Sequence, residues 1–336
     1  MNILALETSC DETSAAVVRD GRHVLSNITA SQTELHGIYG GVVPEIAARR
    51  HIELIRPLTE RALERAGIPK ESVGAVACTT APGLIGALLV GLSFAKAMAF
   101  GLGVPFVPVH HIRGHVAANY LAYPELKPPF VALVASGGHS SILRVNDYTE
   151  YETLGVTRDD AAGECFDKVA RVMGLGYPGG PLLDRLAQGG DPRAFRLPRA
   201  QIDSSPLDMS FSGLKTSVIN IIHNAAQRGD ALNQADLAAS FSQAVSDTLI
   251  SRLKIALETT GCNTAVVAGG VAANSWLRRE ILQTVNGKNL HLTPLDLCGD
   301  NAAMIGAQGF YEFMAGRAAP LSHNALATRG ADERLC

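Results

Sequence analysis

Aromatic side chains are scarce in this 336-residue sequence, where phenylalanine, tryptophan and tyrosine together account for 5%. Glycine is plentiful by contrast, with 33 residues. Because glycine has no Cβ, it suits tight turns and close approaches of the backbone to a ligand. The composition therefore favours a site built on glycine-rich loops over a pocket lined by aromatic rings.

Paired cysteines and long apolar runs are also missing. No C-x-x-C pair occurs, the pattern of reduced thiols in a cytosolic protein. The six single cysteines are Cys10, Cys78, Cys165, Cys262, Cys298 and Cys336. The first apolar run stops at Glu7, too early for a signal peptide, and no other run approaches the roughly 20 residues that span a bilayer. We therefore expect a cytoplasmic protein with no membrane contact.

Charge of one sign does not dominate either. The net charge is -3, so the chain as a whole does not attract nucleic acid, and RNA binding would need a local basic patch or a basic partner. With 47% hydrophobic and 18% charged residues, the composition is that of an ordinary globular protein. The length is sufficient for two cores, and we expect two domains.

The sequence pattern indicates an internal duplication, with a chance similarity of two hairpins as the alternative. Residues 3–26 and 130–154 each begin with an apolar strand, turn on small polar residues and return through alternating apolar positions, as paired hairpins do. Helical patterns over 43–67 and 84–103 alternate with short strands at 76–80 and 104–109, which indicates an α/β domain. Beyond residue 155 the pattern is largely helical, and residues 302–315 form a last helix that is expected to pack on the first domain.

Three loops of small residues follow apolar strands. They are ETSCDETS at 7–14, SGGHS at 136–140 and AGGVAAN at 268–274. Such turns let backbone N–H groups point at phosphate oxygens, so together they indicate a bound nucleotide. The first loop also carries Glu7, Asp11 and Glu12. These carboxylates suit a phosphate site only if a divalent cation lies between them or if one acts as a base; the alternative is three solvated turn acids.

Two histidines four residues apart, His111 and His115 in HHIRGH, predict a metal site. If residues 111–122 are helical, both imidazoles lie on the same helix face and can reach one ion. Asp300, at a turn before the last helix, is the best third ligand, with His110 and His139 as competitors. Two histidines and one carboxylate leave coordination positions open, which suits iron or zinc acting on a substrate oxygen. The alternative is a histidine pair that caps the helix.

These motifs together resemble the TsaD family of tRNA adenosine threonylcarbamoyltransferases over residues 3–305. The motifs are ETSCDET, GGVVPEIAARRH at 40–51, APGLIGALLVG at 81–91, HHIRGH, SGGH, AGECFDK at 163–169, GYPGGP at 176–181, SFSGLKT at 210–216, AGGVAAN and the DN pair at 300–301. Ser140 follows the SGGH histidine where the family commonly has threonine, which conserves the hydroxyl group.

The resemblance implies a fold and a division into domains. The fold is α/β, a duplicated actin-like fold (ribonuclease H-like, shared by actin, sugar kinases and Hsp70) of two domains with a nucleotide cleft between them. We expect an N-terminal actin-like domain of residues 1–126 with 302–336, and a C-terminal actin-like domain of residues 127–301 with helical insertions.

The resemblance also implies an activity and its residues. The family transfers the threonylcarbamoyl group from threonylcarbamoyl-AMP to N6 of adenosine 37 in tRNAs that read ANN codons. His111, His115 and Asp300 would bind one divalent metal, iron or else zinc, and Asp11 or Glu12 would take a proton from N6 or orient the substrate. The residues expected to hold the adenylate, or ATP and AMP analogues, are Val134, Ala135, Ser136, Gly137, Gly138, Asp167, Gly180, Asp184 and Asn274.

The family further implies partners: a paralogue of the same fold (TsaB), a small ATPase (TsaE), and TsaC, which makes the intermediate. The helix over 43–67 is a candidate paralogue interface, unless it is buried within its own domain. The candidate phosphate contacts for tRNA, which are ordinary surface charges on the alternative interpretation, are Arg49, Arg50, Arg193, Arg196, Arg199 and Lys215.

Three other functions compete with this one. The histidine pair invites comparison with zinc peptidases, and a metal-dependent glycoprotease is one alternative. The H-E-x-x-H motif, however, places its glutamate base beside the first histidine, and here that residue is Ile112. A catalytically silent ATP-binding interaction module is the second alternative. A sugar or acetate kinase is the third, and the histidine pair argues against it.

Overall fold

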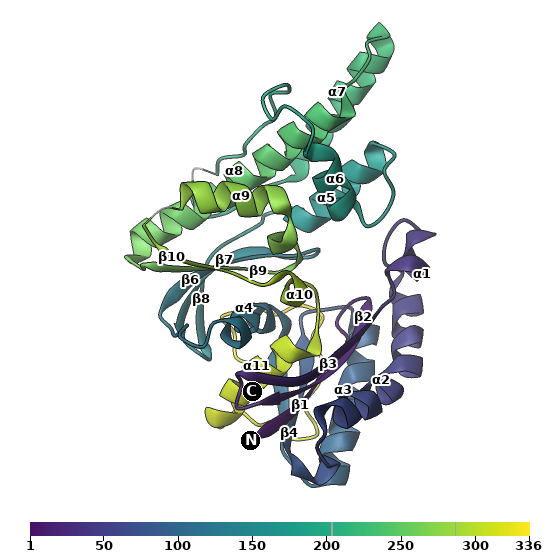
Figure 1. Cartoon of the computed structure of the whole chain (residues 1–336), viewed down its shortest axis with the longest axis vertical. Helices are drawn as coiled ribbons and strands as arrows, with labels where there is room; N and C mark the ends of the chain where they lie inside the picture. Colours follow the sequence, from purple (N-terminus) through teal and green to yellow (C-terminus); the bar gives the residue numbers. More distant parts are fainter. Residues whose placement is uncertain (203, 286) are drawn as a thin grey trace. The chain divides into compact units, whose positions relative to one another are not determined.

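The computed structural model describes residues 1–202, 204–285 and 287–336 and divides into two compact units. Unit 1 comprises Met1–Pro128, Val145–Glu152 and Thr293–Cys336. Unit 2 comprises Pro129–Arg144 and Thr153–Leu292. Each unit is described by itself, with its elements labelled as in Figure 1.

The strands and helices follow the alternating plan expected from the sequence. The strands are β1 Asn2–Glu7, β2 Glu12–Arg19, β3 His23–Ser31, β4 Val73–Ala81, β5 Phe106–His110, β6 Phe130–Ala135, β7 Ser140–Asp147, β8 Glu150–Val156, β9 Thr264–Ala268 and β10 Asn289–Leu292. The helices are α1 Thr33–Gly37, α2 Pro44–Ala66, α3 Ile85–Leu102, α4 His111–Ala122, α5 Ala162–Val172, α6 Gly179–Ala187, α7 Ser212–Arg228, α8 Gln234–Thr260, α9 Ser275–Thr284, α10 Leu295–Cys298 and α11 Ala302–Met314.

The two sheets have the same strand order, which confirms the duplication. One is β3-β2-β1-β4-β5 and the other, read from its opposite edge, is β8-β7-β6-β9-β10. In each sheet the third, fourth and fifth strands run parallel to one another. These strands are β1, β4 and β5 in the first sheet and β6, β9 and β10 in the second. Parallel neighbours present their carboxyl ends at one sheet edge, which is where ligands of open α/β sheets bind.

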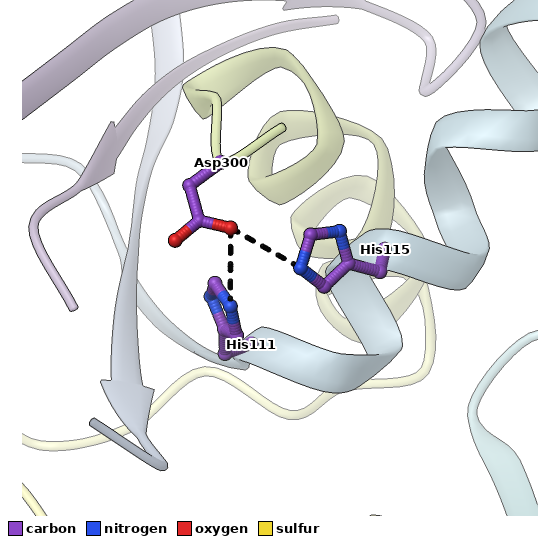
Figure 2. Close-up of side chains that lie close together, drawn as sticks. All are labelled: His111, His115 and Asp300. Atoms are coloured by element: carbon purple, nitrogen blue, oxygen red, sulfur yellow. Dashed lines mark ion pairs between the residues drawn. The ribbon is translucent and has the colours of Figure 1, made fainter. Parts of the chain in front are cut away.

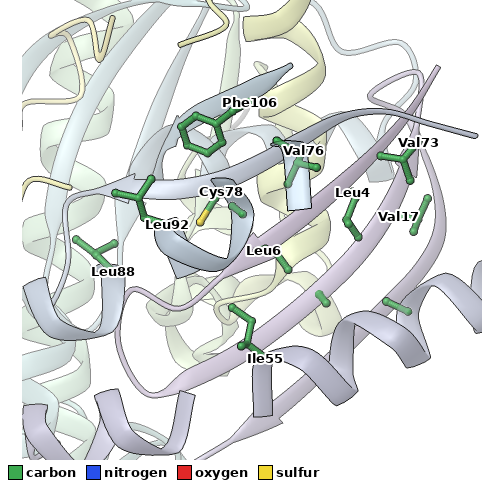
Figure 3. Close-up of a cluster of buried hydrophobic side chains, with 14 of the residues drawn as sticks. Leu4, Leu6, Val17, Ile55, Val73, Val76, Cys78, Leu88, Leu92 and Phe106 are labelled. Atoms are coloured by element: carbon green, nitrogen blue, oxygen red, sulfur yellow. The ribbon is translucent and has the colours of Figure 1, made fainter. Parts of the chain in front are cut away.

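Successive side chains of β1 point to opposite faces of the first sheet, so unit 1 has one part of its core on each face. Leu4 and Leu6 face α2 and α3 in one buried cluster, shown in Figure 3. Ile3 and Ala5 belong to a second cluster that includes the start of α11. Much of this second face is alanine, so helix α11 packs closely against β1, β2 and α4. The expectation that the last helix returns to the first domain is confirmed.

Apart from residues 127 and 128, which belong to unit 1, the compact units and the predicted domains differ in extent at two places. Residues 293–301 belong to unit 1, where the Asn119 side-chain amide donates to the Thr293 hydroxyl at 2.9 Å. The tip of the β7–β8 hairpin, residues 145–152, belongs there as well, because Tyr148 stacks on Tyr311 with ring centroids 4.1 Å apart. These contacts join residues far apart in the sequence, and the division that the resemblance implied does not take them into account.

In unit 2 the longest helix is α8, and it forms as the sequence pattern predicts. The apolar side chains four residues apart along it are all buried, namely Leu237, Phe241, Val245, Leu249 and Leu253. Asn233 caps its first turn by accepting from the backbone N–H groups of Ala235 and Asp236. Helices α6, α7 and α9 pack against α8, so this helix is the main support of the unit.

Helix α3 corrects the expectation that no apolar segment approaches the length of a membrane span. Its 18 residues, Ile85–Leu102, are long and apolar enough by length and composition. Leu88 and Leu92, however, are buried in the core against the sheet. A core helix and a membrane span share this composition, so one such helix is weak support for a membrane contact.

Candidate functional site

Both histidines of the HHIRGH motif lie on the first turns of α4, immediately after β5. Their imidazoles point from one face of the helix toward the Asp300 carboxylate, as Figure 2 shows. Asp300 Oδ1 lies 3.5 Å from His111 Nε2 and 3.2 Å from His115 Nε2. The two rings meet edge to face, with centroids 4.7 Å apart. The structure therefore brings together the three residues that the sequence predicted as metal ligands.

The donor set fits a metal ion. The three ligand atoms all lie within 4.8 Å of one another. Donors about 2.1 Å from one ion are about 3.0–3.5 Å apart when their angle at the ion is about 90–110°, which matches the two distances to Asp300. Among the described residues, Nδ1 of buried His115 has no hydrogen-bond partner, and its Nε2 faces the Asp300 carboxylate, where it could share an ion with it. The Asp300 side chain remains 20% exposed, so this side of the site is accessible.

Gly114 and α11 determine where Asp300 lies. A Cβ at Gly114 would be 2.7 Å from the Ile305 side chain, so the absence of one lets α4 and α11 approach closely. Asn301, directly after Asp300, caps α11 by accepting from Met304 N–H at 3.1 Å. Ala302, the first residue of α11, donates its backbone N–H to the Ser14 hydroxyl of β2 at 2.9 Å. The start of α11, and with it Asp300, is thus fixed to the first sheet.

Glu7 orients His111 from behind. This carboxylate ends β1 and is fully buried. Its Oε2 lies 3.0 Å from His111 Nδ1 and accepts from the Thr79 hydroxyl at 2.6 Å, and its Oε1 accepts from Ser9 N–H. A carboxylate on Nδ1 fixes the imidazole tautomer that leaves Nε2 facing Asp300, as in the outer shells of known metal sites.

Charges within the cluster shift the pKa values of its members. Burial alone would lower the pKa of His111, but the Asp300 and Glu7 carboxylates raise it well above its ordinary value. Burial alone would raise the pKa of Asp300, but His111 and His115 lower it well below its ordinary value. The pKa of Glu7 is lowered in the same way by His111, against the effect of burial. A bound cation would compete with the imidazole proton for the same carboxylates.

Asp11 and Glu12 lie in the same charged neighbourhood. Burial, followed by the charges of Asp300 and Asp11, raises the pKa of Glu12 to about 9. Glu12 Oε1 also accepts from the Ser31 hydroxyl at 3.1 Å. Without a bound cation, a carboxyl group with this pKa retains its proton at neutral pH. A cation near Asp300 would favour the ionised form of Glu12.

In unit 2 the predicted nucleotide loops gather at the carboxyl ends of β6 and β9. A Cβ at Gly269 would lie 2.4 Å from the Ala135 carbonyl oxygen, so the loops after the two strands touch. Gly163 N–H donates to the Ser136 carbonyl at 3.2 Å. Ser140, the position of the departure from threonine, accepts from Ala162 N–H at 2.9 Å and so holds the start of α5. Gly137 and Gly138 lie in the loop between these contacts.

Polar side chains predicted to bind nucleotide also cap the helices of unit 2. Asp167 accepts from Gly179 N–H at 2.7 Å, at the start of α6 and beside Gly180. Asp184 accepts from Ser275 N–H at 3.0 Å, and Asn274 accepts from Leu277 N–H at 2.9 Å, both at the start of α9. The three side chains therefore lie at the starts of α6 and α9, where each accepts from a backbone N–H group.

The remaining candidates have other surroundings. His110 Nδ1 accepts from Ile112 N–H and caps α4, and its Nε2 lies 3.1 Å from the Arg329 carbonyl, so it is not grouped with the metal ligands. His139 is not in that group either. Of the predicted tRNA contacts, Arg50 and Arg199 already pair with carboxylates, and Lys215 is half-buried. Arg49, Arg193 and Arg196 are exposed.

The sequence did not reveal three supports of the site. They are the Glu7 contact with His111, the Thr79 hydroxyl behind Glu7, and the Arg22 guanidinium. Arg22 donates to the Tyr120 and Tyr123 carbonyls at the end of α4, at 3.1 and 3.2 Å. One signal was present in the sequence, since Glu7 directly follows an uninterrupted apolar strand whose residues face a core.

Comparisons with known proteins agree with this geometry. The model of the family described as "TsaD: tRNA N6-adenosine threonylcarbamoyltransferase" matches residues 23–307. The chain is 52% identical over 327 residues to the tRNA N6-adenosine threonylcarbamoyltransferase of Moorella thermoacetica, which covers 97% of this chain and 96% of that protein. It is 48% identical over 336 residues to the corresponding protein of Clostridium botulinum, which covers 99% of each.

Solved structures support the fold. HypF, in its phosphate- and nucleotide-bound form, aligns with a TM-score of 0.61 at 14% identity over 94% of this chain and 46% of that chain. Component A of the Acidaminococcus fermentans (R)-2-hydroxyglutaryl-CoA dehydratase aligns with a TM-score of 0.53 at 14% identity, covering 93% and 98%. These identities show the fold alone, and it is the actin-like fold that was expected. On the family match and the near full-length relatives, this chain belongs to the TsaD family of tRNA N6-adenosine threonylcarbamoyltransferases.

Proposed function

We propose that this chain transfers the threonylcarbamoyl group of threonylcarbamoyl-AMP to N6 of adenosine 37 in tRNAs that read ANN codons. The observation that carries the proposal is the 52% identity, over 97% of the chain, to a threonylcarbamoyltransferase. The geometry supports it, because unit 1 holds a metal-ligand set and unit 2 holds small-residue loops at helix starts. Among the described residues, no glutamate occupies the peptidase position next to His111, where Ile112 is buried.

His111, His115 and Asp300 would hold one divalent metal ion per chain, iron(II) in our proposal with zinc(II) as the alternative. Such an ion would supply Lewis acidity to an oxygen of the mixed anhydride. Glu7 would keep His111 in the required tautomer. The exposed side of Asp300 would leave room for the substrate.

The reaction joins N6 of adenosine to the carbamoyl carbon and breaks the bond from that carbon to the phosphate oxygen. AMP leaves with the bonding electron pair, and N6 loses a proton. Asp11 and Glu12 are our candidates to accept this proton or to orient N6, because both carboxyl groups belong to the charged neighbourhood of Asp300. Glu12, the first residue of β2, would accept the proton only in the ionised form that a bound cation favours. Replacement of either by Ala without a change in transfer rate would remove that residue from the mechanism.

We propose that unit 2 binds the adenylate. The residues are Val134, Ala135, Ser136, Gly137, Gly138, Asp167, Gly180, Asp184 and Asn274. Loops of small residues at helix starts present free N–H groups to phosphate, and carboxylates suit ribose hydroxyls. A protein of similar fold, the activator of the 2-hydroxyisocaproyl-CoA dehydratase from Clostridium difficile, has been solved with bound ADPNP, which supports a nucleotide ligand for the fold.

We also propose a cytoplasmic location and a set of partners. The partners are tRNA, the paralogue TsaB and the ATPase TsaE, with TsaC supplying threonylcarbamoyl-AMP. Among the candidate arginines, Arg49, Arg193 and Arg196 are the stronger ones for tRNA phosphate contacts, because Arg50 and Arg199 are already engaged by carboxylates.

Mass spectrometry of nucleosides tests the proposal. Transfer RNA is incubated with threonylcarbamoyl-AMP and this protein, alone and with each partner, and then digested to nucleosides. We expect threonylcarbamoyladenosine, with the His115→Ala variant as the inactive control. If the modified adenosine forms under no combination, the chain is not this transferase, and AMP retained without transfer would indicate a nucleotide-binding module.

A further inference from the structure

Arg113 is the one residue of the HHIRGH motif whose charge the proposed reaction does not use. It lies two residues from each metal-binding histidine, so its side chain leaves α4 on the opposite side of the helix. It is 2% exposed and is among the largest fully buried side chains. A buried guanidinium must have its donors satisfied, because the cost of an unpaired buried charge is several kcal/mol.

The partners of Arg113 come from three other segments of unit 1. Nη1 donates to Glu312 Oε1 of α11 at 3.0 Å and to the Thr149 carbonyl at 3.3 Å. Nε donates to the Ala331 carbonyl at 2.8 Å, and Nη2 donates to the Glu333 carbonyl at 3.0 Å. Two of the four acceptors therefore belong to the last six residues of the chain.

The tail segment, residues 318–336, follows the first sheet to reach α4. Ala319 N–H donates to the Phe106 carbonyl of β5, and Leu326 N–H donates to the Thr80 carbonyl of β4, both at 2.9 Å. The segment then passes the start of α4, where the Arg329 carbonyl lies 3.1 Å from Nε2 of the capping residue His110. Beyond that point it reaches Arg113 through the Ala331 and Glu333 carbonyls, and its last residues, Arg334 and Cys336, contact Glu150 and the Arg317 carbonyl.

We propose that the tail segment, acting through Arg113, positions the first turn of α4 and thereby sets the metal affinity of His111, His115 and Asp300. This inference rests on the metal centre proposed above. Metal sites tolerate displacements of only about half an ångström in their ligands, so a shift of this turn weakens coordination without removing a ligand. Arg113 is thus a positioning residue for the metal site.

Cobalt(II) is the probe that tests this proposal in the 336-residue chain. Its dissociation constant is measured from the visible absorption of the bound ion, alongside the melting temperature of each variant. We expect Arg113→Met to weaken cobalt binding by about tenfold or more and to change the spectrum, because coordination geometry changes with ligand position. Arg113→Lys keeps the charge and part of the hydrogen bonding, so it should recover part of the affinity.

A chain that ends at residue 328 is the second variant. It removes the carbonyl groups of Arg329, Ala331 and Glu333 but leaves Arg113 in place. If the tail acts through Arg113, the truncation and Arg113→Met together should weaken binding no more than the stronger single change. This variant and Arg113→Lys also keep the test decisive if Arg113→Met does not fold.

Arg252→Met is the matched control. Arg252 is a buried arginine of unit 2 that donates to the Asp208 and Ala200 carbonyls, so its loss should lower the melting temperature but not the cobalt affinity. If the Arg113 variants and the truncated chain bind cobalt with the affinity and spectrum of the wild type, the positioning role is wrong but the metal centre stands. Absence of cobalt binding to the wild type, or its persistence in His115→Ala, would overturn the metal centre and this inference with it.

Discussion

The two units share one strand order, but the sites proposed for them are of different kinds. In unit 1 the chemistry lies in buried charged side chains, Glu7, His111, His115 and Asp300, which pair with one another. In unit 2 it lies in backbone turns after β6 and β9, whose neighbouring carboxylates and amides cap helices. The comparison teaches that strand order determines where a site can form, and that the residues after each strand determine which ligand it takes.

The largest expected effect comes from removing Asp300, which should abolish the metal site of unit 1 and leave the nucleotide site of unit 2 intact. In Asp300→Ala the two imidazoles lose their shared carboxylate, so we expect the metal to be lost and the transfer rate to fall by at least about a hundredfold. The AMP affinity of unit 2 should stay at the wild-type value. Metal analysis after dialysis, the nucleoside assay and calorimetry with AMP measure the three quantities. Loss of AMP binding together with the metal would show that the two sites are not independent.

A smaller effect is expected from Glu7→Gln, which keeps the size of the side chain and removes its charge. Outer-shell carboxylates typically contribute about 10- to 100-fold to metal affinity, so we expect a loss within that range with all three ligands in place. A metal titration measures it. Glu53→Gln, on the exposed face of α2, is the control and should leave the affinity unchanged. An unchanged affinity in Glu7→Gln would mean that Glu7 only fills space behind His111.

Sequence patterns could predict the local features of the site. The four-residue spacing of His111 and His115 placed both on one helix face, and the turn before the last helix indicated Asp300. Resemblance to the family joined the three residues into one ligand set. Asn274 carried a second local signal, because an asparagine directly before a helix is a common cap, and that is the role its side chain has in the structure.

Features that depend on long-range packing could not be predicted in this way. Glu7 and His111 are 104 positions apart, and Arg113 and Ala331 are 218 apart. No periodicity or spacing relates such residues, since their contact arises only when β1, α4 and the tail segment pack together. The extents of the units differ from the predicted domains for the same reason.

Two asparagine caps allow the units to be compared by one identical change. Asn274 caps α9 in unit 2 and Asn301 caps α11 in unit 1, each through its side-chain oxygen. Replacement of either by Ala should cost about 1 kcal/mol of unfolding free energy. Only Asn301→Ala should also weaken metal binding, because it loosens the turn that holds Asp300. Only Asn274→Ala should weaken AMP binding. Denaturant unfolding measures the stability of each variant, and titrations with metal and with AMP measure the two affinities. If both variants lose both metal and AMP affinity, the two caps do not act on separate sites.

The smallest expected effect is a pH dependence confined to unit 2. Helix α7 has no side-chain cap at Phe211, and Asp159 from a distant loop supplies one, accepting from Phe211 N–H at 2.8 Å and Ser212 N–H at 3.2 Å. Burial alone would raise the pKa of Asp159, but the hydrogen bonds from Ser210, Phe211 and Ser212 outweigh it and lower that pKa.

A carboxyl group with a lowered pKa in the folded state contributes stability above its unfolded pKa, about 4 for aspartate, and loses this contribution as the pH falls through the folded value. Asp159→Asn should therefore lower the denaturant midpoint at pH 7 and leave a smaller difference from the wild type at about pH 3. Asp230→Asn, at an exposed ion pair beyond the end of α7, is the matched control and should change neither midpoint measurably. An equal loss at both pH values would mean that Asp159 acts by the shape of its side chain, since only its charge disappears in acid.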